Sequence, residues 1–311
     1  MTTPITQARF QALVDATTRN WSENAFKELT DEEKMRFSMY NVRGTDRAYE
    51  EFAAVTGLPD VPRFNGTLTY ASPSMGYSQR IEPAEFALGV EIEYKLQQNN
   101  LTNVLKDWAG MLRTSDNRTK ERAAAKGYAK LNSAAFDFMP LNEEGVAICS
   151  TSHTTKVVGV STTSGFSNLG TSALDEVSVE ATRLLMRGFK NLDGNRISIM
   201  PDTLIIPDDL SKVAKEINDT TTGLYGAEGT VNVQKGRWKI ITWSMLGDYD
   251  TNNWMMADSR YMKKYAVWLD HTDAEMANTI DFETKRIKHS IYSYWGLGFT
   301  NWPWIFMHAV S

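Results

Sequence analysis

Apolar and polar side chains alternate along residues 86–96, FALGVEIEYKL. A period of two places every second side chain on the same face, so this segment predicts a half-buried strand with one polar face. The preceding residues 67–82 are β-prone on both sides of a turn that contains Pro73 and Gly76, and they predict the partner strand of a long hairpin whose tip is 72–77. An isolated hairpin of this kind is only marginally stable in water, so we expect it to pack on a neighbouring element or on another subunit.

A helical period replaces the alternation between residues 97 and 132. The apolar stripe of this helix consists of Leu101, Val104, Leu105, Trp108 and Leu112. Its middle, residues 113–122, is polar all round, and the three alanines at 123–125 restore a strong helix preference. A continuous helix of this length measures about 50 Å, which suits a flat, extended domain better than a compact globule.

A helix–strand–helix unit is predicted between residues 174 and 217. The first helix, 174–189, has one face formed by Val177, Ala181, Leu184, Leu185 and Gly188. Pro201 and Pro207 bracket a short apolar strand at 203–206, because each proline lacks a backbone donor and fixes its own φ. Two aspartates after Pro207 suit a helix start, and the second helix follows at 209–217. These elements form a layered unit.

The rest of the chain gives weaker patterns. Residues 1–64 read as helical and then extended, with too little apolar pattern for a core of their own, so this arm is expected to lie on something else. Residues 136–149 resemble a strand, and residues 280–295 could form one long strand. The ending YWGLGFTNWPWIFMH, residues 294–308, is too apolar to be a free tail.

Composition narrows the function classes. The chain has 311 residues, with 33 Lys and Arg against 38 Asp and Glu and no basic block, so nothing resembles a DNA-gripping surface. One cysteine, Cys149, excludes an internal disulfide and fits a reducing cytoplasm. No signal peptide pattern and no apolar stretch near the ~20 residues of a membrane span are found. The 9 Trp residues suit cores and interfaces alike.

Candidates for catalysis or ligand binding are weak. Residues 248–253, DYDTNN, offer oxygen ligands but lack the glycine and the glutamate of a calcium loop. The glycines of 165–170 miss a nucleophile elbow by one position, and Gly296-x-Gly298 has Asn301 where a dinucleotide loop needs its third glycine. The four histidines are far apart in sequence, and the paired acidic residues suit caps and turns. We therefore predict no catalytic residue, no cofactor, no metal site and no enzyme activity.

The order of the later motifs resembles one protein family. A helix, then NRISIMPDTLIIPDDL, then a second helix is similar to the major head subunits of Mu-like tailed phages. The segments WSMLGDYDTNNWMMADSR and KKYAVWLD, and the aromatic ending GLGFTNWPWIFMH, resemble further stretches of these subunits. The resemblance covers roughly residues 10–311 and implies an α+β fold of the Hong Kong 97 capsid type. That fold has an N-terminal arm, an extended loop, a spine helix, a peripheral domain and an axial domain.

The resemblance implies a division of the chain. Residues 1–64 become the N-terminal arm, 65–96 the extended loop, a β-hairpin, and 97–170 the peripheral domain with its spine helix. Residues 171–279 become the axial domain, and 280–311 return to the peripheral domain as C-terminal strands. We place a candidate subunit interface at the tip of the predicted hairpin, at Met75, Gly76, Tyr77 and Arg80.

The implied function is that of a major capsid protein of a tailed double-stranded DNA phage. It would self-assemble into pentamers and hexamers of an icosahedral shell in the virion, built in the cytoplasm of a bacterial host. Its partners would be other copies of itself, scaffold and portal proteins, decoration proteins, and packaged DNA bound without sequence specificity, with no membrane. Two alternatives remain open: an encapsulin-like compartment shell, and a soluble hydrolase with a β-rich aromatic binding domain.

Overall fold

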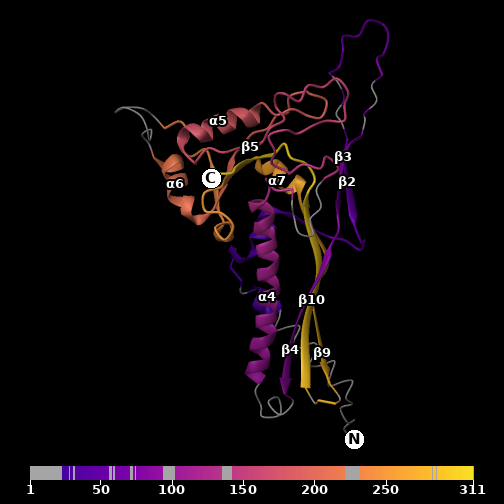
Figure 1. Ribbon diagram of the computed structural model, residues 1–311, viewed down its shortest axis with the longest axis vertical. Helices are drawn as coiled ribbons and strands as arrows, with labels where there is room; N and C mark the ends of the chain where they lie inside the picture. Colours follow the sequence, from indigo (N-terminus) through magenta and orange to yellow (C-terminus); the bar gives the residue numbers. More distant parts are fainter. Residues whose placement is uncertain are drawn as a thin grey trace.

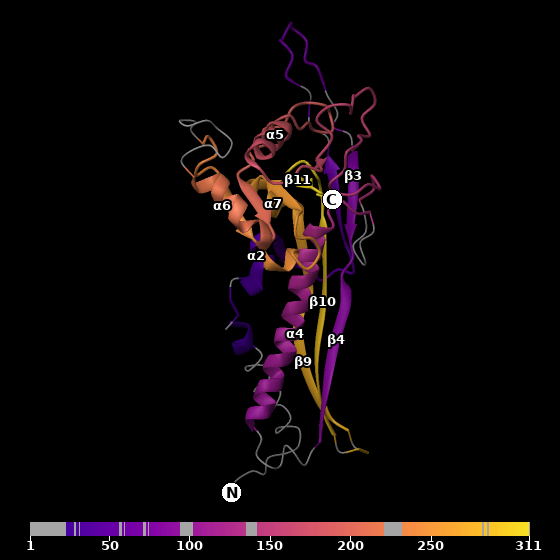
Figure 2. The ribbon, with the colours of Figure 1, turned by 60° about the vertical axis from the view of Figure 1, so that its left-hand side comes forward.

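A computed structural model of the chain describes most of its residues and contains three β-sheets (Figures 1 and 2). The described residues are 23–27, 29–30, 32–55, 58, 60–70, 73, 75–93, 102–134, 142–220, 232–281, 283–284 and 286–310. Part of the predicted arm, residues 1–22, and most of the loop at 219–237 lie outside these ranges.

The larger sheet has the strand order β5-β11-β8-β6-β7. Its strands are β5 (Leu169–Gly170), β6 (Thr203–Ile206), β7 (Lys239–Thr242), β8 (Trp254–Ala257) and β11 (Ile305–His308). Every side chain of β6, β8 and β11 is buried. A strand buried on both faces reads as a continuous apolar run, which is why the short apolar run between two prolines was recognisable in the sequence.

Helices surround this sheet. They are α5 (Glu176–Arg187), α6 (Ser211–Asp219) after the 3-10 turn η2 (Asp208–Leu210), and α7 (Ser259–Tyr265). Asp175 caps α5, since its side chain accepts a hydrogen bond of 2.6 Å from the Ser178 N–H. The predicted order of helix, strand and helix between residues 174 and 217 is confirmed.

The second sheet is elongated and has the order β1-β9-β10-β4. Its strands are β1 (Asn41–Gly44), β4 (Ala84–Glu93), β9 (Ala266–Ile280) and β10 (Arg286–Phe299), and helix α4 (Thr102–Ala129) runs beside them (Figure 1). A hydrogen bond of 2.7 Å from Ser293 to Asp116 joins α4 to β10. The long helix predicted in this region is therefore present. A short helix, α2 (Met35–Met39), and the 3-10 turn η1 (Glu32–Lys34) contact α4.

The predicted hairpin between residues 67–82 and 86–96 is wrong in its pairing. Strand β3 (Met75–Ile81) pairs with β2 (Glu50–Val55) in a separate two-stranded sheet, whereas β4 pairs with β10. Residues 75–77 of the expected hairpin tip, 72–77, are consequently part of a strand, and residues 72 and 74 of that tip lie outside the described residues. The alternation of β4 was genuine, but a period of two does not reveal which strand is the partner.

Two other strand predictions also differ from the structure. The predicted strand at 280–295 is not continuous: β9 ends at Ile280, residues 283–284 form a turn, and β9 and β10 form a long antiparallel hairpin. Within the described part of the predicted strand at 136–149, residues 142–149 form turns and contain no strand. Charged and apolar residues are mixed throughout residues 280–295, so the sequence pattern did not indicate the turn between β9 and β10.

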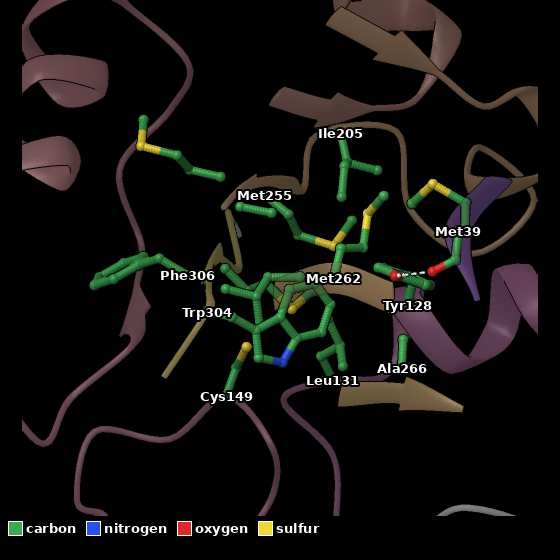
Figure 3. Close-up of a cluster of buried hydrophobic side chains, with 14 of the residues drawn as sticks. Met39, Tyr128, Leu131, Cys149, Ile205, Met255, Met262, Ala266, Trp304 and Phe306 are labelled. Carbon is green, nitrogen blue, oxygen red and sulfur yellow. Dashed lines mark hydrogen bonds between the residues drawn. The ribbon is translucent and has the colours of Figure 1, made fainter. Parts of the chain in front are cut away.

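A single large core joins α4 to the larger sheet. Figure 3 shows side chains from distant segments meeting there, among them Tyr128 of α4, Met255 of β8 and Trp304. The Tyr128 hydroxyl donates a hydrogen bond of 3.0 Å to the Met39 carbonyl and so fixes α2 on α4. The Trp-rich end of the chain is buried in this core, which explains why it is too apolar for a free tail.

The Gly-x-Gly motif of β10 allows a close crossing of the backbone. A Cβ atom at Gly296 would lie 2.9 Å from the Glu82 carbonyl oxygen, and one at Gly298 would lie 2.8 Å from the Ile81 Cδ1. Real Cβ atoms do not approach other atoms this closely, so only glycine fits under the segment that links β3 to β4. The motif is therefore a packing device in this fold.

Candidate functional site

The segment that links β2 to β3 carries exposed apolar side chains. Figure 1 shows this segment, coloured indigo to purple, projecting beyond the rest of the molecule. The exposed fractions of its large apolar side chains are Leu58 62%, Val61 96%, Phe64 68%, Leu68 67% and Tyr70 89%. Monomeric soluble proteins rarely expose a contiguous apolar patch of large size. We name residues 58–70 the projecting loop and identify it as a candidate binding surface.

The residues that the sequence selected lie together on β3 at the base of this projection. The Met75 side chain is exposed, as is that of Arg80, whose guanidinium lies 3.8 Å from the Tyr49 ring centroid and 2.5 Å from Glu82. Gly76 is buried against Leu192. A Cβ atom at this position would lie only 2.5 Å from the Leu192 Cδ1, so the close packing favours glycine.

Tyr77 of the same strand binds a loop of its own chain. Its hydroxyl lies 2.7 Å from the Thr154 Oγ1, and Lys156 lies over its ring. Glu143 holds the two parts together, since it accepts hydrogen bonds from the Ser78 N–H and from Lys156. Glu143 therefore fastens the loop to β3, whereas Glu144 accepts hydrogen bonds from Thr154 within the loop.

Helix α5 exposes the apolar face that its sequence pattern defines. Val177, Ala181, Leu184 and Leu185 are exposed, whereas Val179, Thr182 and Met186 form the buried face. At 100° per residue these two faces point in nearly opposite directions. The periodicity that marks this helix in the sequence thus describes a surface that this chain leaves open to solvent. We name these four exposed residues the α5 apolar face.

One side of the polar middle of α4 is buried and paired within the described part of the chain, whereas Thr114, Arg118, Thr119 and Arg122 on the other side are exposed. Lys120 Nζ lies 3.1 Å from Asp116 and 2.6 Å from Asp273 of β9, and the Arg113 Nη2 lies 3.0 Å from the same Asp273 carboxylate. Farther along the helix, Glu121 pairs with a buried arginine of α2. These contacts connect α4 to β9 and α2, so the polar residues fix the helix on its sheet.

Asp273 should make stability depend on pH. Burial raises the pKa of Asp273, but the positive charges of Lys120 and Arg113 outweigh it and hold that pKa at about 2. Since the folded value is below the unfolded value, Asp273 stabilises the fold above pH 4 and loses this contribution as the pH falls toward 2. Screening of this half-exposed carboxylate limits the contribution to ~1 kcal/mol.

We expect Asp273→Asn to lower the melting temperature at pH 7 by a few degrees and to have little effect near pH 2. Melting curves of the subunit between pH 2 and pH 7 check this. The matched variant is Asp46→Asn, since Asp46 is exposed and forms no ion pair within the described residues. A difference for Asp273→Asn that persists unchanged down to pH 2 would contradict the proposed pairing.

The histidines join elements of the subunit. His153 lies 3.1 Å from Glu144 and 3.0 Å from Asn168, and it stacks on an indole ring. His308 accepts a hydrogen bond from the Ser172 N–H and lies 2.8 Å from the Thr182 hydroxyl, and burial lowers its pKa to about 4. His308 therefore connects β11 of the larger sheet to α5 and the segment before it, and His153 connects three loop segments outside the strands.

The remaining chemical candidates also have structural partners. The Asp250 carboxylate accepts hydrogen bonds from the N–H groups of Asn252 and Asn253, so it closes the turn that the sequence offered as a weak calcium loop. Burial raises the pKa of the Cys149 thiol. No three His, Cys, Asp or Glu side chains of the described residues form a group suited to a metal ion. Within the same ranges, no helix is long and apolar enough to cross a bilayer.

One family model matches most of the chain. The model of a family described as "Phage capsid protein" matches residues 76–306. The comparison with curated protein sequences finds no match. The matched range begins one residue into β3, includes α4 and four strands of the larger sheet, and ends in the middle of β11.

Solved capsid structures have the same fold. That of Mycobacterium phage Patience covers 96% of this chain and 88% of its own, with a TM-score of 0.59 and 8% identity. The capsid of a native GTA particle has a TM-score of 0.56 and 11% identity, with 91% of each chain covered. The capsid structure of Cyanophage P-SCSP1u has a TM-score of 0.56 and 14% identity, with 88% of this chain and 86% of that chain covered. The expected Hong Kong 97-type capsid fold is confirmed.

Proposed function

The chain belongs to the phage capsid protein family, and from this membership we propose that it is the major capsid protein that builds the shell of a tailed double-stranded DNA phage. Copies of the chain assemble into pentamers and hexamers, and these assemble into an icosahedral shell in the virion. The chain acts as a structural protein in this proposal. Its chemistry consists of contacts between copies.

The observation that carries the proposal is the projecting loop. The segment extends away from the rest of the molecule (Figure 1), and its large apolar side chains gain little burial within the chain. Full burial of a large apolar side chain contributes about 1.5–3 kcal/mol. A neighbouring copy that covered several side chains of the projecting loop would therefore gain several times this free energy of binding. The α5 apolar face supports the same conclusion from another part of the molecule.

The division of the chain follows from this reading. The arm at 1–64, the peripheral domain at 97–170, the axial domain at 171–279 and the returning strands at 280–311 stay as proposed boundaries. The extended loop is better placed at 50–81, because β2 pairs with β3 and both strands support the projecting loop. The predicted contact residues Met75, Gly76, Tyr77 and Arg80 then lie at its base.

The partners proposed are, first, other copies of this chain. Scaffold, portal and decoration proteins would contact the assembled shell, and assembly would take place in the bacterial host cytoplasm. The net charge of −5 suits a container for DNA, because a strongly basic lining would bind the packaged genome tightly. Many moderate contacts per copy make such a lattice stronger than any single contact.

The test is expression of the chain alone, followed by size-exclusion chromatography and negative-stain electron microscopy. Shells, tubes or capsomer rings are the expected result. If the chain stays a monomer alone, co-expression with the scaffold gene of the same phage genome must produce these assemblies. A chain that remains monomeric under both conditions would contradict the proposed function.

A further inference from the structure

A cavity of about 280 Å³ at one end of the larger sheet is lined by arginines. Its lining consists of Arg183, Arg187, Met200, Pro201, Asp202, Arg237 and Arg260. Two of the arginines come from α5, one precedes β7 and one lies in α7. Four guanidinium groups around one small cavity form an environment suited to an anion. We name it the arginine cavity.

Three of the four arginines already have a carboxylate partner. Arg183 donates two hydrogen bonds to Glu180, and the Arg237 Nη1 lies 3.7 Å from the same carboxylate. The Arg260 Nη2 lies 2.6 Å from Asp258, whose side chain is buried.

Arg187 is different from the other three. It is exposed, and it forms no ion pair with any described residue. The third carboxylate of this region, Asp202, accepts hydrogen bonds from the Ser259 N–H and hydroxyl. Four positive groups therefore face three carboxylates that are already engaged, and the charge of Arg187 is left for an external ligand.

Exposed acidic residues lie at the opposite end of the same strands. Residues 200–202, which line the arginine cavity, directly precede β6. Pro207 directly follows β6, and the exposed Asp208 and Asp209 come next. Because β7 is parallel to β6, Arg237 precedes its amino end at the cavity and the exposed Asp248 follows its carboxyl end. Four strand residues span about 13 Å, so the arginine cavity and these exposed aspartates lie at opposite ends of the two strands.

We propose that the arginine cavity binds a carboxylate of a second copy of this chain, supplied by the Asp208, Asp209 and Asp248 patch, in a head-to-tail contact between axial domains. A ring needs two different, complementary patches on each subunit, and the two ends of β6 and β7 provide them. The α5 apolar face lies on the same helix as Arg183 and Arg187, so apolar burial would accompany the ion pair. This inference rests on the proposed function, since it specifies one contact within a capsomer.

The experiment measures the protein concentration needed for capsomer and shell formation by light scattering and electron microscopy. We expect Arg187→Glu to raise this concentration at least about tenfold, because like charges across an interface cost several kcal/mol. The combined change of Asp208→Lys and Asp209→Lys should have a similar effect. A chain that carries all three changes should regain assembly, because the negative charge then lies at position 187 of the arginine cavity and the positive charges lie at positions 208 and 209 of the opposing patch. Lys212→Glu on the exposed face of α6 is the matched control and should assemble normally.

The outcomes separate the two proposals. A wild-type chain that forms no assembly under any condition would overturn the proposed function together with this contact. A wild-type chain that assembles while Arg187→Glu assembles equally well would overturn this contact alone. The contact would also be overturned if assembly of Arg187→Glu were restored neither by Asp208→Lys with Asp209→Lys nor by Asp248→Lys. If Arg187→Glu shells form normally but retain less DNA, the cavity binds a phosphate, and the carboxylate proposal is wrong.

Discussion

Replacement of Arg36 by alanine is expected to lower the free energy of unfolding of the subunit by about 3–5 kcal/mol. The Arg36 guanidinium is buried between α2 and α4, where it lies 3.3 Å from Glu121 and donates a hydrogen bond of 2.8 Å to Asn117. The Arg36 N–H also donates to Glu121. Without the guanidinium, a fully buried carboxylate has no positive partner, and urea unfolding of the purified subunit measures the loss.

This loss should depend on pH. Burial raises the pKa of Glu121 to about 7, although the charge of Arg36 and its hydrogen bonds lower it. An acid whose folded pKa exceeds its unfolded value near 4.5 destabilises the fold as the pH rises through that interval. Removal of Arg36 strengthens this effect. We therefore expect the loss caused by Arg36→Ala to be larger at pH 8 than at pH 5.

An exposed ion pair of the same chain is the control. Arg286 lies 3.0 Å from Glu91, and their side chains are 53% and 47% exposed. Arg286→Ala should change the free energy of unfolding very little, because exposed pairs are screened and mobile. Equal losses for the two variants would contradict the role assigned to Arg36. Replacement of Arg36 and Glu121 together by methionine should recover much of the stability, since the isolated charge is then absent.

Local patterns predicted the elements whose signals are contained within a few residues. The unit made of α5, β6 and α6 was readable, because its prolines, aspartates and 3.6-residue periods are close together in sequence. The long helix α4 was readable for the same reason. The number and place of these elements did not require knowledge of the rest of the fold.

Strand partners could not be predicted, because pairing depends on residues far away in the chain. Strand β4 pairs with β10, which begins at Arg286, and the link between β3 and β4 crosses from one sheet to another. Turn residues between two β-prone segments favoured a hairpin of neighbours. In the structure, Pro73 precedes β3 and Gly76 lies within it, and the partner strand β2 comes earlier in the chain.

The candidate surfaces show a second limit of sequence patterns. The apolar period of α5 marks Leu184 and Leu185, and a period of this kind does not state whether the covering partner is the same chain or another. The polar middle of α4 shows the reverse case, since Lys120 is buried by Asp116 and Asp273. Apolar residues of the projecting loop have no regular period, so neither periodic rule could detect them.

Substitution of the four large side chains Val61, Phe64, Leu68 and Tyr70 by serine is expected to abolish shell formation without unfolding the subunit. These side chains are at least 67% exposed in the subunit, so their removal changes few contacts within the chain. On a neighbouring copy they would together bury enough apolar area to contribute on the order of 5 kcal/mol. Electron microscopy and size-exclusion chromatography of the variant, beside its melting curve, measure assembly and folding separately.

Val158→Ser provides the matched control, because this valine is 98% exposed and lies outside the projecting loop. It should assemble like the wild-type chain. A loop variant that forms normal shells would show that the loop contacts no neighbour, and the proposed function would lose the observation that carries it. A loop variant that unfolds would instead show that the loop stabilises its own subunit. Normal melting with loss of assembly is the one combination expected of a segment whose apolar side chains are buried only between copies, since burial gains energy only where water is removed.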